Sequence, residues 1–162
     1  MEIRLYRYYG DEAVTKSVME VWMEGEEEPR LRCEAREARF RDYEEAFPGA
    51  SRFCLPRGVW PVKCGGSPYS AMGARVVKCP GHRQVWLAPC PYGWPQQQVG
   101  CITLGEAEYH YYMDEETGQQ VEYPPKRRMK PGRKVYDELE KLLYEAYGRE
   151  EEMKLKIEGL KN

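Results

Sequence analysis

The chain of 162 residues carries 25 Lys and Arg against 27 Asp and Glu, and 41% of its residues are hydrophobic. A chain of this length buries about 70% of its unfolded surface, so we expect one domain over 1–162 that folds without disulfides or metal. The net charge of -2 gives the protein no general electrostatic attraction to nucleic acid. The longest uncharged run of residues is rich in Pro, Gln and Gly, so it cannot form a membrane helix.

The first part of the chain has the alternating pattern of paired strands. Residues 2–9 and 15–23 place apolar side chains at every second position on either side of a Gly10-Asp11 turn, which predicts a β-hairpin. A short third strand is expected at 31–33. The highly charged segment 34–52 contains a Pro-Gly break, so we expect it to run mostly as a surface connection.

The middle of the chain is divided into short segments by prolines and glycines. We expect strands at 59–64, 75–79, 84–88 and 101–104. Pro61 lies within the first of these strands and has no N–H to donate, which predicts an edge position or a bulge there. Several short strands at this spacing are typical of a barrel or a sandwich.

The last part of the chain contains a hairpin, a helix and a strand. Residues 106–113 and 119–123 flank an acidic loop, which indicates the hairpin. Apolar residues recur at helical spacing over 134–147, and Gly148 is expected to end that helix. Alternation at 153–157 predicts a strand that closes the sheet. The predicted fold is α+β, a mainly antiparallel β barrel or sandwich with one C-terminal helix packed on it and a final strand.

The spacing of the six cysteines and two histidines does not indicate a metal site. No two cysteines form a Cys-x-x-Cys motif, and His82 and His110 are not spaced as zinc partners, so we expect no metal and no cofactor. The N-terminal residues lack a basic region followed by an apolar core, which predicts a cytoplasmic protein without membrane contact, unless the sequence is that of a mature form. In that compartment we expect reduced cysteines that are mostly buried.

Three segments are candidates for function. Gly100-Cys101-Ile102 places a cysteine after a small residue at the start of a predicted strand, which favours a thiol held at the entrance of that strand. The tyrosine-rich arm 109–112 suits cross-strand packing or stacking on a sugar or base. The basic run 126–134 suits a solvated loop or contact with an anionic partner.

Four motifs follow one another in the middle of the chain: Leu55-Pro56-Arg57-Gly58-Val59-Trp60-Pro61-Val62, Ser67-Pro68-Tyr69, Val77-Lys78-Cys79-Pro80-Gly81-His82 and Gly100-Cys101-Ile102-Thr103-Leu104-Gly105. In this order they resemble a family of uncharacterised domains from phages and gut bacteria. Its patterns are I-P-x-G-x-Y-x-V, S-P-x-F, x-V-P-G-F, I-x-I-H-x-G-N and G-C-I-L-x-G, followed by a helix and a final strand. The resemblance covers most of the chain and implies that 106–133 is an insertion.

The Gly-Cys-Ile motif is also similar to the active-site pattern of the L,D-transpeptidases, which cross-link peptidoglycan through a cysteine acyl-enzyme. This similarity implies that Cys101 is the nucleophile, that a histidine takes its proton, and that backbone N–H groups hold the oxyanion. Three positions depart from the pattern: Ala88 stands where the family has histidine, Gln98 where the motif has Ser or Thr, and Thr103 where it has Arg. His82 or His110 is therefore the candidate base.

These observations leave three hypotheses of function. The first is a phage- or mobile-element-related binding domain that has lost the catalytic pair of a transpeptidase-like fold, with peptidoglycan or a protein as its partner. The second is a cysteine-dependent acyl transferase or hydrolase that acts on peptidoglycan peptides through Cys101. The third is a structural or assembly protein that uses the tyrosine-rich hairpin and the basic run to bind a partner.

Overall fold

The computed structural model describes residues 1–45, 47–90, 100–106, 110–113, 116–118, 120–123 and 131–160, with the backbone alone for 110–113 and 120–123. Its elements are β1 (Glu2–Gly10), β2 (Thr15–Trp22), β3 (Leu31–Glu37), the 3-10 helix η1 (Ala50–Arg52), β4 (Gly58–Gly65), β5 (Gly73–Val76), β6 (Val85–Pro89), β7 (Cys101–Gly105), β8 (His110–Met113), β9 (Gln120–Tyr123), α1 (Arg133–Gly148) and β10 (Lys154–Gly159).

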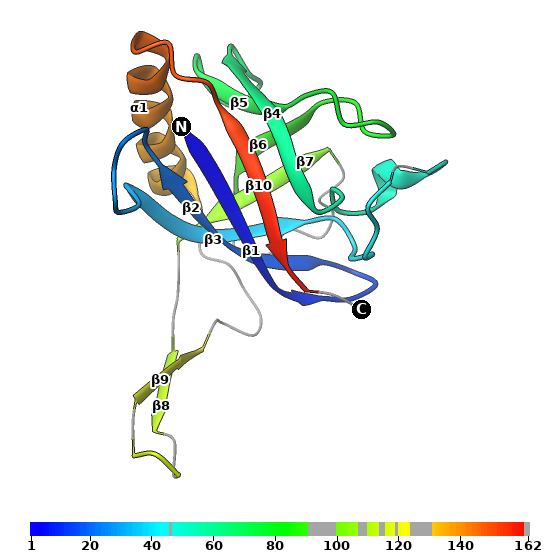
Figure 1. Ribbon diagram of the computed structural model, residues 1–162, viewed down its shortest axis with the longest axis vertical. Helices are drawn as coiled ribbons and strands as arrows, with labels where there is room; N and C mark the ends of the chain where they lie inside the picture. The colour runs from blue at the N-terminus through cyan, green and yellow to red at the C-terminus, as the bar shows by residue number, and fades with distance from the viewer. Residues whose placement is uncertain are drawn as a thin grey trace.

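Eight strands form a closed barrel in the order β1-β10-β4-β5-β6-β7-β3-β2 (Figure 1). The pairs β1–β10 and β6–β7 are parallel, and the other neighbours are antiparallel. The last strand therefore closes the sheet between the first strand and β4. The predicted α+β fold, a mainly antiparallel barrel with one helix near the C-terminus and a final strand, is confirmed.

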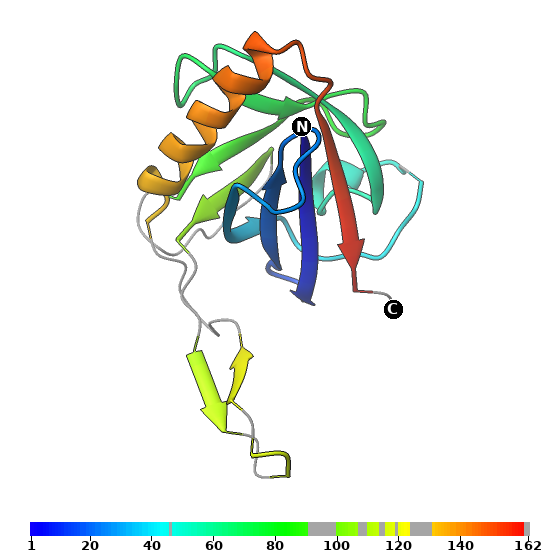
Figure 2. The ribbon, with the colours of Figure 1, turned by 60° about the vertical axis from the view of Figure 1, so that its left-hand side comes forward.

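The interior of the barrel and the apolar face of α1 form one hydrophobic core. Alternate residues of the strands point inward, among them Ile3, Leu5 and Leu155, all fully buried. Leu139 and Leu143 of α1 join them, because their spacing places both on one face of the helix. The helix contacts β3, β5, β6 and β7, and Figure 2 shows it lying across the ends of these central strands.

The start of α1 is tied to the end of β7 by main-chain hydrogen bonds. Gly132 donates its N–H to the carbonyl of Cys90 at 2.8 Å, and Cys90 donates to Leu104 at 2.8 Å. A Cβ on Gly132 would overlap the carbonyl oxygen of Leu104, so only glycine fits this contact. The helix is thus fixed against the strand that begins with Cys101.

The helix α1 ends at Gly148, where the sequence predicts its end, but the residue that caps it is a different one. Gly148 is still helical, and the residue in the left-handed conformation is Glu150, with φ of 55°. The Glu151 N–H bonds to the carbonyl of Ala146, as in a Schellman cap. The prediction that the helix ends at Gly148 is therefore confirmed, but the left-handed position of the cap, which favours glycine, lies two residues later and carries an acidic side chain.

β3 continues four residues beyond the predicted strand 31–33, through Glu37. The charged residues in this extension are buried but paired. Glu37 accepts two hydrogen bonds from Arg7 inside the barrel, at 2.7 and 2.9 Å, and Arg7 also donates to the carbonyl of Leu55. Burial of charges is tolerated when they are paired in this way. The prediction of a surface connection over 34–52 was wrong for this part.

The segment around Pro61 corrects two further predictions. β4 lies between β10 and β5 in regular register, so Pro61 is at neither an edge nor a bulge. Its carbonyl accepts a hydrogen bond from the Val77 N–H at 3.1 Å, so the proline removes only the one donor that would face β5 at the end of the β4–β5 pairing. The strand expected at 75–79 is shifted toward the N-terminus because Lys78, with φ of 59°, has left the extended conformation.

β8 and β9 form a separate two-stranded antiparallel sheet within 106–133, the range expected as an insertion. Figures 1 and 2 both draw this hairpin away from the barrel. The aromatic side chains at 109–112 and most of the basic run at 126–134 lie outside the described residues. Their predicted roles in stacking and in partner contact remain predictions.

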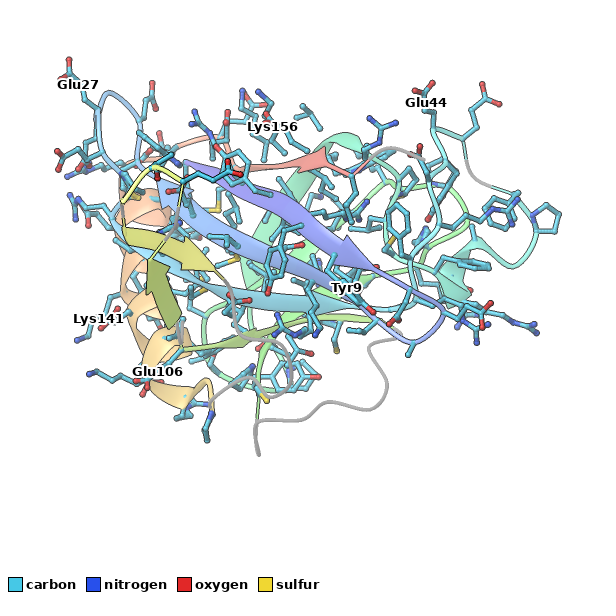
Figure 3. All side chains as sticks on the ribbon, turned by 90° about the horizontal axis from the view of Figure 1, so that it is seen from below. Tyr9, Glu27, Glu44, Glu106, Lys141 and Lys156 are labelled. Carbon is cyan, nitrogen blue, oxygen red and sulfur yellow. The ribbon has the colours of Figure 1, made fainter. Side chains whose placement is uncertain are left out.

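Charged side chains also lie on the outer surface. Glu27, Glu44 and Lys141 are exposed and point away from the barrel (Figure 3). Within the described ranges, no helix combines the length and the apolarity that a bilayer-crossing segment requires.

Candidate functional site

Cys101 is the first residue of β7 and is half-buried. Gly100, with φ of 80°, turns the chain into the strand, and its carbonyl accepts a hydrogen bond from the Trp86 N–H at 3.1 Å. The sulfur of Cys101 lies 3.3 Å from the phenolic oxygen of Tyr69. The sequence motif therefore does place a thiol at a strand entrance, and its partner is a tyrosine.

Tyr69 is held by the short loop between β4 and β5. The Ser67 hydroxyl accepts hydrogen bonds from the N–H groups of Tyr69 and Ser70, both at 3.1 Å. The Tyr69 ring packs edge-on against Tyr136 of α1 at 6.4 Å. Its hydrogen bond to Cys101, together with burial, raises the pKa of the Tyr69 phenol to about 12. At neutral pH the phenol is therefore protonated and can donate to the sulfur.

The register of β7 defines one face around Cys101. Ile102 and Leu104 point into the core and are fully buried, so Cys101 and Thr103 lie on the opposite face of the strand. On the parallel neighbour β6, Trp86 pairs with Cys101 and Ala88 pairs with Thr103. Ala88 is the position at which the transpeptidase resemblance expects histidine. It lies on β6, two residues after the partner of Cys101 and on the same face of the sheet, and its side chain is only a methyl group.

A buried charged cluster lies beside Thr103 on β3. Arg36 pairs with Thr103 in the strand register, and its guanidinium donates to Glu34 at 2.7 Å. Glu34 also accepts a hydrogen bond from the Tyr8 hydroxyl at 2.8 Å. Within the described residues, Oε1 of Glu34 and Nη2 of Arg36 have no hydrogen-bond partner although both are buried. An arginine therefore stands beside the position where the resemblance expects one, on a different strand.

His82 binds a group of residues that does not include Cys101. Its Nδ1 lies 3.7 Å from the sulfur of Cys79, and its Nε2 lies 3.3 Å from the Tyr43 hydroxyl and 3.4 Å from the carbonyl oxygen of Phe53. Because a carbonyl only accepts, a neutral ring carries its proton on Nε2, and Nδ1 accepts from the thiol of Cys79. Burial raises the pKa of that thiol to about 11, so it remains protonated at neutral pH.

The turn Cys79-Pro80-Gly81-His82 creates this contact. The His82 N–H donates to the carbonyl of Cys79 at 3.1 Å, and Gly81 has φ of 78°. Proline followed by a glycine of positive φ is the pattern of a type II turn, which returns His82 to the side of Cys79. The Cys-x-x-His spacing was thus a signal in the sequence for the true partner of this histidine.

His110 is the first residue of β8 and pairs with Tyr123. Its side chain lies outside the described residues, so its role as a base stays a prediction. Gln98, the third departure from the transpeptidase motif, lies outside them as well. Among the described side chains, no ring nitrogen is a hydrogen-bond partner of Cys101.

A pocket of about 610 Å³ opens next to the start of β7. It is lined by Ser51, by residues 81–85 and by Gly100, and is called here the Gly100 pocket. His82, Arg83 and Gln84 bring an imidazole, a guanidinium and a carboxamide to its walls. Such groups donate and accept hydrogen bonds, which suits a peptide-like ligand more than a purely apolar one.

The six cysteines are free thiols, and four of them are buried. In the ranges that the structure describes, no three residues of the types His, Cys, Asp and Glu are grouped as metal ligands. What this site offers chemically is a half-buried thiol with a phenolic donor, an adjacent pocket whose walls carry polar side chains, and a buried arginine.

Comparisons of the chain with protein-family models, with curated proteins and with solved structures found no match.

Proposed function

We propose that the protein is a non-catalytic binding domain, related to the phage-associated family and derived from a transpeptidase-like fold. Its ligand would contain peptide groups, as peptidoglycan stem peptides do, and would bind in the Gly100 pocket beside the start of β7. The observation that carries this proposal is the hydrogen bond of the Cys101 thiol to Tyr69 in place of a histidine.

Support comes first from the partners of the two candidate groups. A thiol nucleophile needs a base within hydrogen-bond reach, because a free thiol has a pKa of about 8.5 and is mostly protonated at neutral pH. His82 is bound to Cys79, Tyr43 and the Phe53 carbonyl. Tyr69 keeps its proton at neutral pH because its own pKa is raised to about 12, so it cannot act as the base.

Further support comes from the walls of the Gly100 pocket. Arg83 and Gln84 are exposed, and His82 is half-buried at the same opening. An exposed guanidinium next to a carboxamide suits a carboxylate and the amide groups of a short peptide. The ring of His82 is held by its own hydrogen bonds, whereas the exposed side chains of Arg83 and Gln84 are available to a ligand.

The test is a titration of the protein with soluble peptidoglycan stem peptides, in which calorimetry measures the binding affinity. We expect saturable binding that Cys101→Ala preserves and that Arg83→Ala weakens at least fivefold. The matched control is Lys141→Ala, an exposed residue on the helix, which should leave the affinity unchanged. Binding that is lost in Cys101→Ala, or a peptide adduct on Cys101 in the mass spectrum of the wild-type protein, would overturn the proposal.

A thiol enzyme is the second candidate, and one observation favours it. Cys101 is one of only two cysteines that are half-buried, the other being Cys64, so its sulfur is within reach of small electrophiles. The Ala88→His variant tests this alternative directly, because residue 88 shares the face of Cys101. Transfer or hydrolysis that appears only in Ala88→His would indicate a fold whose catalytic base has been lost, whereas activity in the unmodified chain would establish the enzyme.

A further inference from the structure

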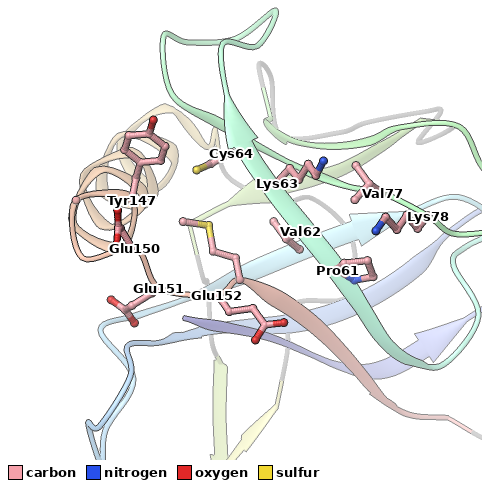
Figure 4. Close-up of a pocket in the computed structure, with 12 residues that line it drawn as sticks. Pro61, Val62, Lys63, Cys64, Val77, Lys78, Tyr147, Glu150, Glu151 and Glu152 are labelled. Atoms are coloured by element: carbon pink, nitrogen blue, oxygen red, sulfur yellow. The ribbon is translucent and has the colours of Figure 1, made fainter.

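A second pocket lies on another part of the barrel, between β4 and the connection from α1 to β10 (Figure 4). Its volume is about 730 Å³. Residues 61–64 of β4 and the segment after β5 form one wall, and residues of the α1–β10 connection form the other. It is called here the β4 pocket, and it shares no lining residue with the Gly100 pocket.

The pocket exists because β4 continues after its neighbour has ended. The β4–β10 pairs stop at Pro61↔Lys154, and one more bond follows from the Val62 N–H to the Met153 carbonyl at 3.0 Å. β4 itself runs on to Gly65, paired only with β5 over its last residues. On the side of α1, this end of the strand is therefore an unpaired edge inside an otherwise closed barrel.

The direction of the main-chain groups follows from the alternation of an antiparallel ladder. Val62 donates toward β10, so Cys64, two residues on, directs its N–H and C=O to the same side. Lys63 directs its own groups toward Arg75 of β5. Among the described residues, neither the N–H nor the C=O of Cys64 has a main-chain partner. Such a pair of groups is what an added strand uses.

The side chains of the pocket divide by charge between its two walls. Lys63 and Lys78 stand on the β4 and β5 side, and Glu150 and Glu152 on the side of the connection (Figure 4). Neither lysine forms an ion pair with another described residue. Opposite charges on opposite walls select a ligand that carries both signs, rather than a simple anion.

The floor of the pocket is apolar and its rim carries an exposed aromatic ring. Val62 and Met153 are buried at its base, with exposed fractions of 8% and 7%. Tyr147 is 63% exposed although its ring borders the pocket. An apolar floor, a free aromatic ring and unpaired main-chain groups together suit an extended peptide better than a small polar molecule.

We propose that the β4 pocket binds an extended peptide segment of a partner protein, which pairs with the free edge of β4 at Cys64. An apolar side chain of the segment contacts Val62 and Met153. An acidic side chain of the segment lies toward Lys63 and Lys78, and a basic side chain lies toward Glu150 and Glu152. This inference does not depend on the function proposed for the Gly100 pocket.

The experiment uses the full chain and an array of synthetic octapeptides whose four central positions vary over Glu, Lys, Val and Thr. We expect the protein to select peptides in which valine is flanked by glutamate and lysine. The charge-reversal variant Lys63→Glu should weaken the selected peptide at least tenfold, and Lys141→Glu on the exposed face of α1 should not. N-methylation of the peptide main chain should abolish binding, because it removes the donors that pair with β4.

Main-chain pairing has a separate readout in the amide spectrum of the protein. The Cys64 N–H should shift and become protected from exchange when the selected peptide is added. The inference would be overturned if the wild-type protein selected peptides no better than a double variant with Lys63→Glu and Lys78→Glu. It would also be overturned if Lys63→Glu and Lys141→Glu weakened peptide binding equally, or if the N-methylated peptide bound as tightly as the unmodified one. Concentration-dependent dimerisation that Lys63→Glu abolishes would also overturn it, because a second copy of the chain would then be the occupant.

Discussion

The sulfur of Cys101 and the phenolic oxygen of Tyr69 lie 3.3 Å apart, although the two residues are on different elements of the barrel. Tyr69 comes from the loop before β5, and Cys101 begins β7. This contact gives the thiol a donor that remains protonated at neutral pH, and no described histidine ring lies within hydrogen-bond distance of the sulfur. The proposal of binding rather than acyl transfer rests on this contact.

The Cys101–Tyr69 contact predicts a change in the titration of the phenol. The hydrogen bond to Cys101 is the largest cause of the raised pKa of Tyr69, about 12. Cys101→Ala removes the sulfur, so the pKa should fall toward the ordinary tyrosine value of about 10. The measurement is an NMR titration of the labelled tyrosine ring, with Tyr69→Phe to assign the signal. An unchanged pKa in Cys101→Ala would show that the contact does not persist in solution.

The buried pair of Arg7 and Glu37 predicts an asymmetric response to substitution. Glu37→Ala leaves a guanidinium uncompensated inside the barrel, and we expect it to lower the free energy of unfolding by about 3–5 kcal/mol. The double variant Arg7→Met, Glu37→Leu removes both charges and should cost much less. Urea denaturation measures both. If Glu37→Ala lowered the free energy of unfolding no more than the double variant does, the pairing of Arg7 with Glu37 would be contradicted.

The end of α1 predicts two stabilising substitutions. Glu150 has φ of 55°, so Glu150→Gly should raise the free energy of unfolding by about 1 kcal/mol. Gly148 is helical with open space around its Cβ position, so Gly148→Ala should also stabilise, by about 0.5–1 kcal/mol. Thermal unfolding checks both. Destabilisation by Gly148→Ala would instead place the left-handed residue at 148.

Glu151 predicts a dependence of stability on pH. Burial acts to raise the pKa of its carboxyl, but hydrogen bonds from the Glu24 N–H and from the ammonium of Met1 outweigh burial and hold the pKa below its usual value. A lowered pKa in the folded state means that the carboxylate stabilises the fold above the unfolded value of 4.5. This contribution is lost as the pH falls through the lowered pKa.

The measurement for Glu151 is the difference in unfolding free energy between the wild-type protein and Glu151→Gln as a function of pH. The difference should be full at pH 6 and should shrink steadily below about pH 4.5. A difference that is constant from pH 6 to pH 3 would mean that the charge of Glu151 contributes nothing to the fold.

The fold was predictable wherever one face of an element is apolar. Alternation located β1, β2 and β10, and helical spacing located α1, because burial of one face imposes these periods. The extension of β3 through Glu37 was missed because its buried charges find partners far along the chain, such as Arg7. Periodicity cannot indicate a partner 30 residues away.

The glycine that fixes the helix shows a second limit of the sequence. Gly132 precedes α1 and looks like an ordinary turn residue, but the carbonyl of Leu104 leaves no room for any side chain there. Only the assembled barrel brings these two segments together. The parallel pairing of β10 with β1 could not be predicted from the sequence for the same reason, because it joins segments near the two ends of the chain.

The candidate site was predictable in part. The Gly-Cys-Ile motif correctly placed Cys101 at the start of a strand. Its partner Tyr69 lies in a Ser-Pro-Tyr motif that entered the sequence analysis only as part of a resemblance. Tyr69 and Cys101 are 32 residues apart in the chain, and only the folded barrel brings them together. Arg36 was missed because its link to Thr103 exists only in the register of β3 and β7.

The most direct test of the central claim is mass spectrometry of Cys101 after incubation with peptidoglycan stem peptides at neutral pH. Cys64, the other half-buried cysteine, serves as the internal control for non-specific modification. The binding-domain account predicts an unmodified Cys101 and no peptide turnover, with peptide affinity retained in Cys101→Ala. An acyl adduct on Cys101 that is absent from Cys64 and released with turnover would contradict it and establish a thiol enzyme.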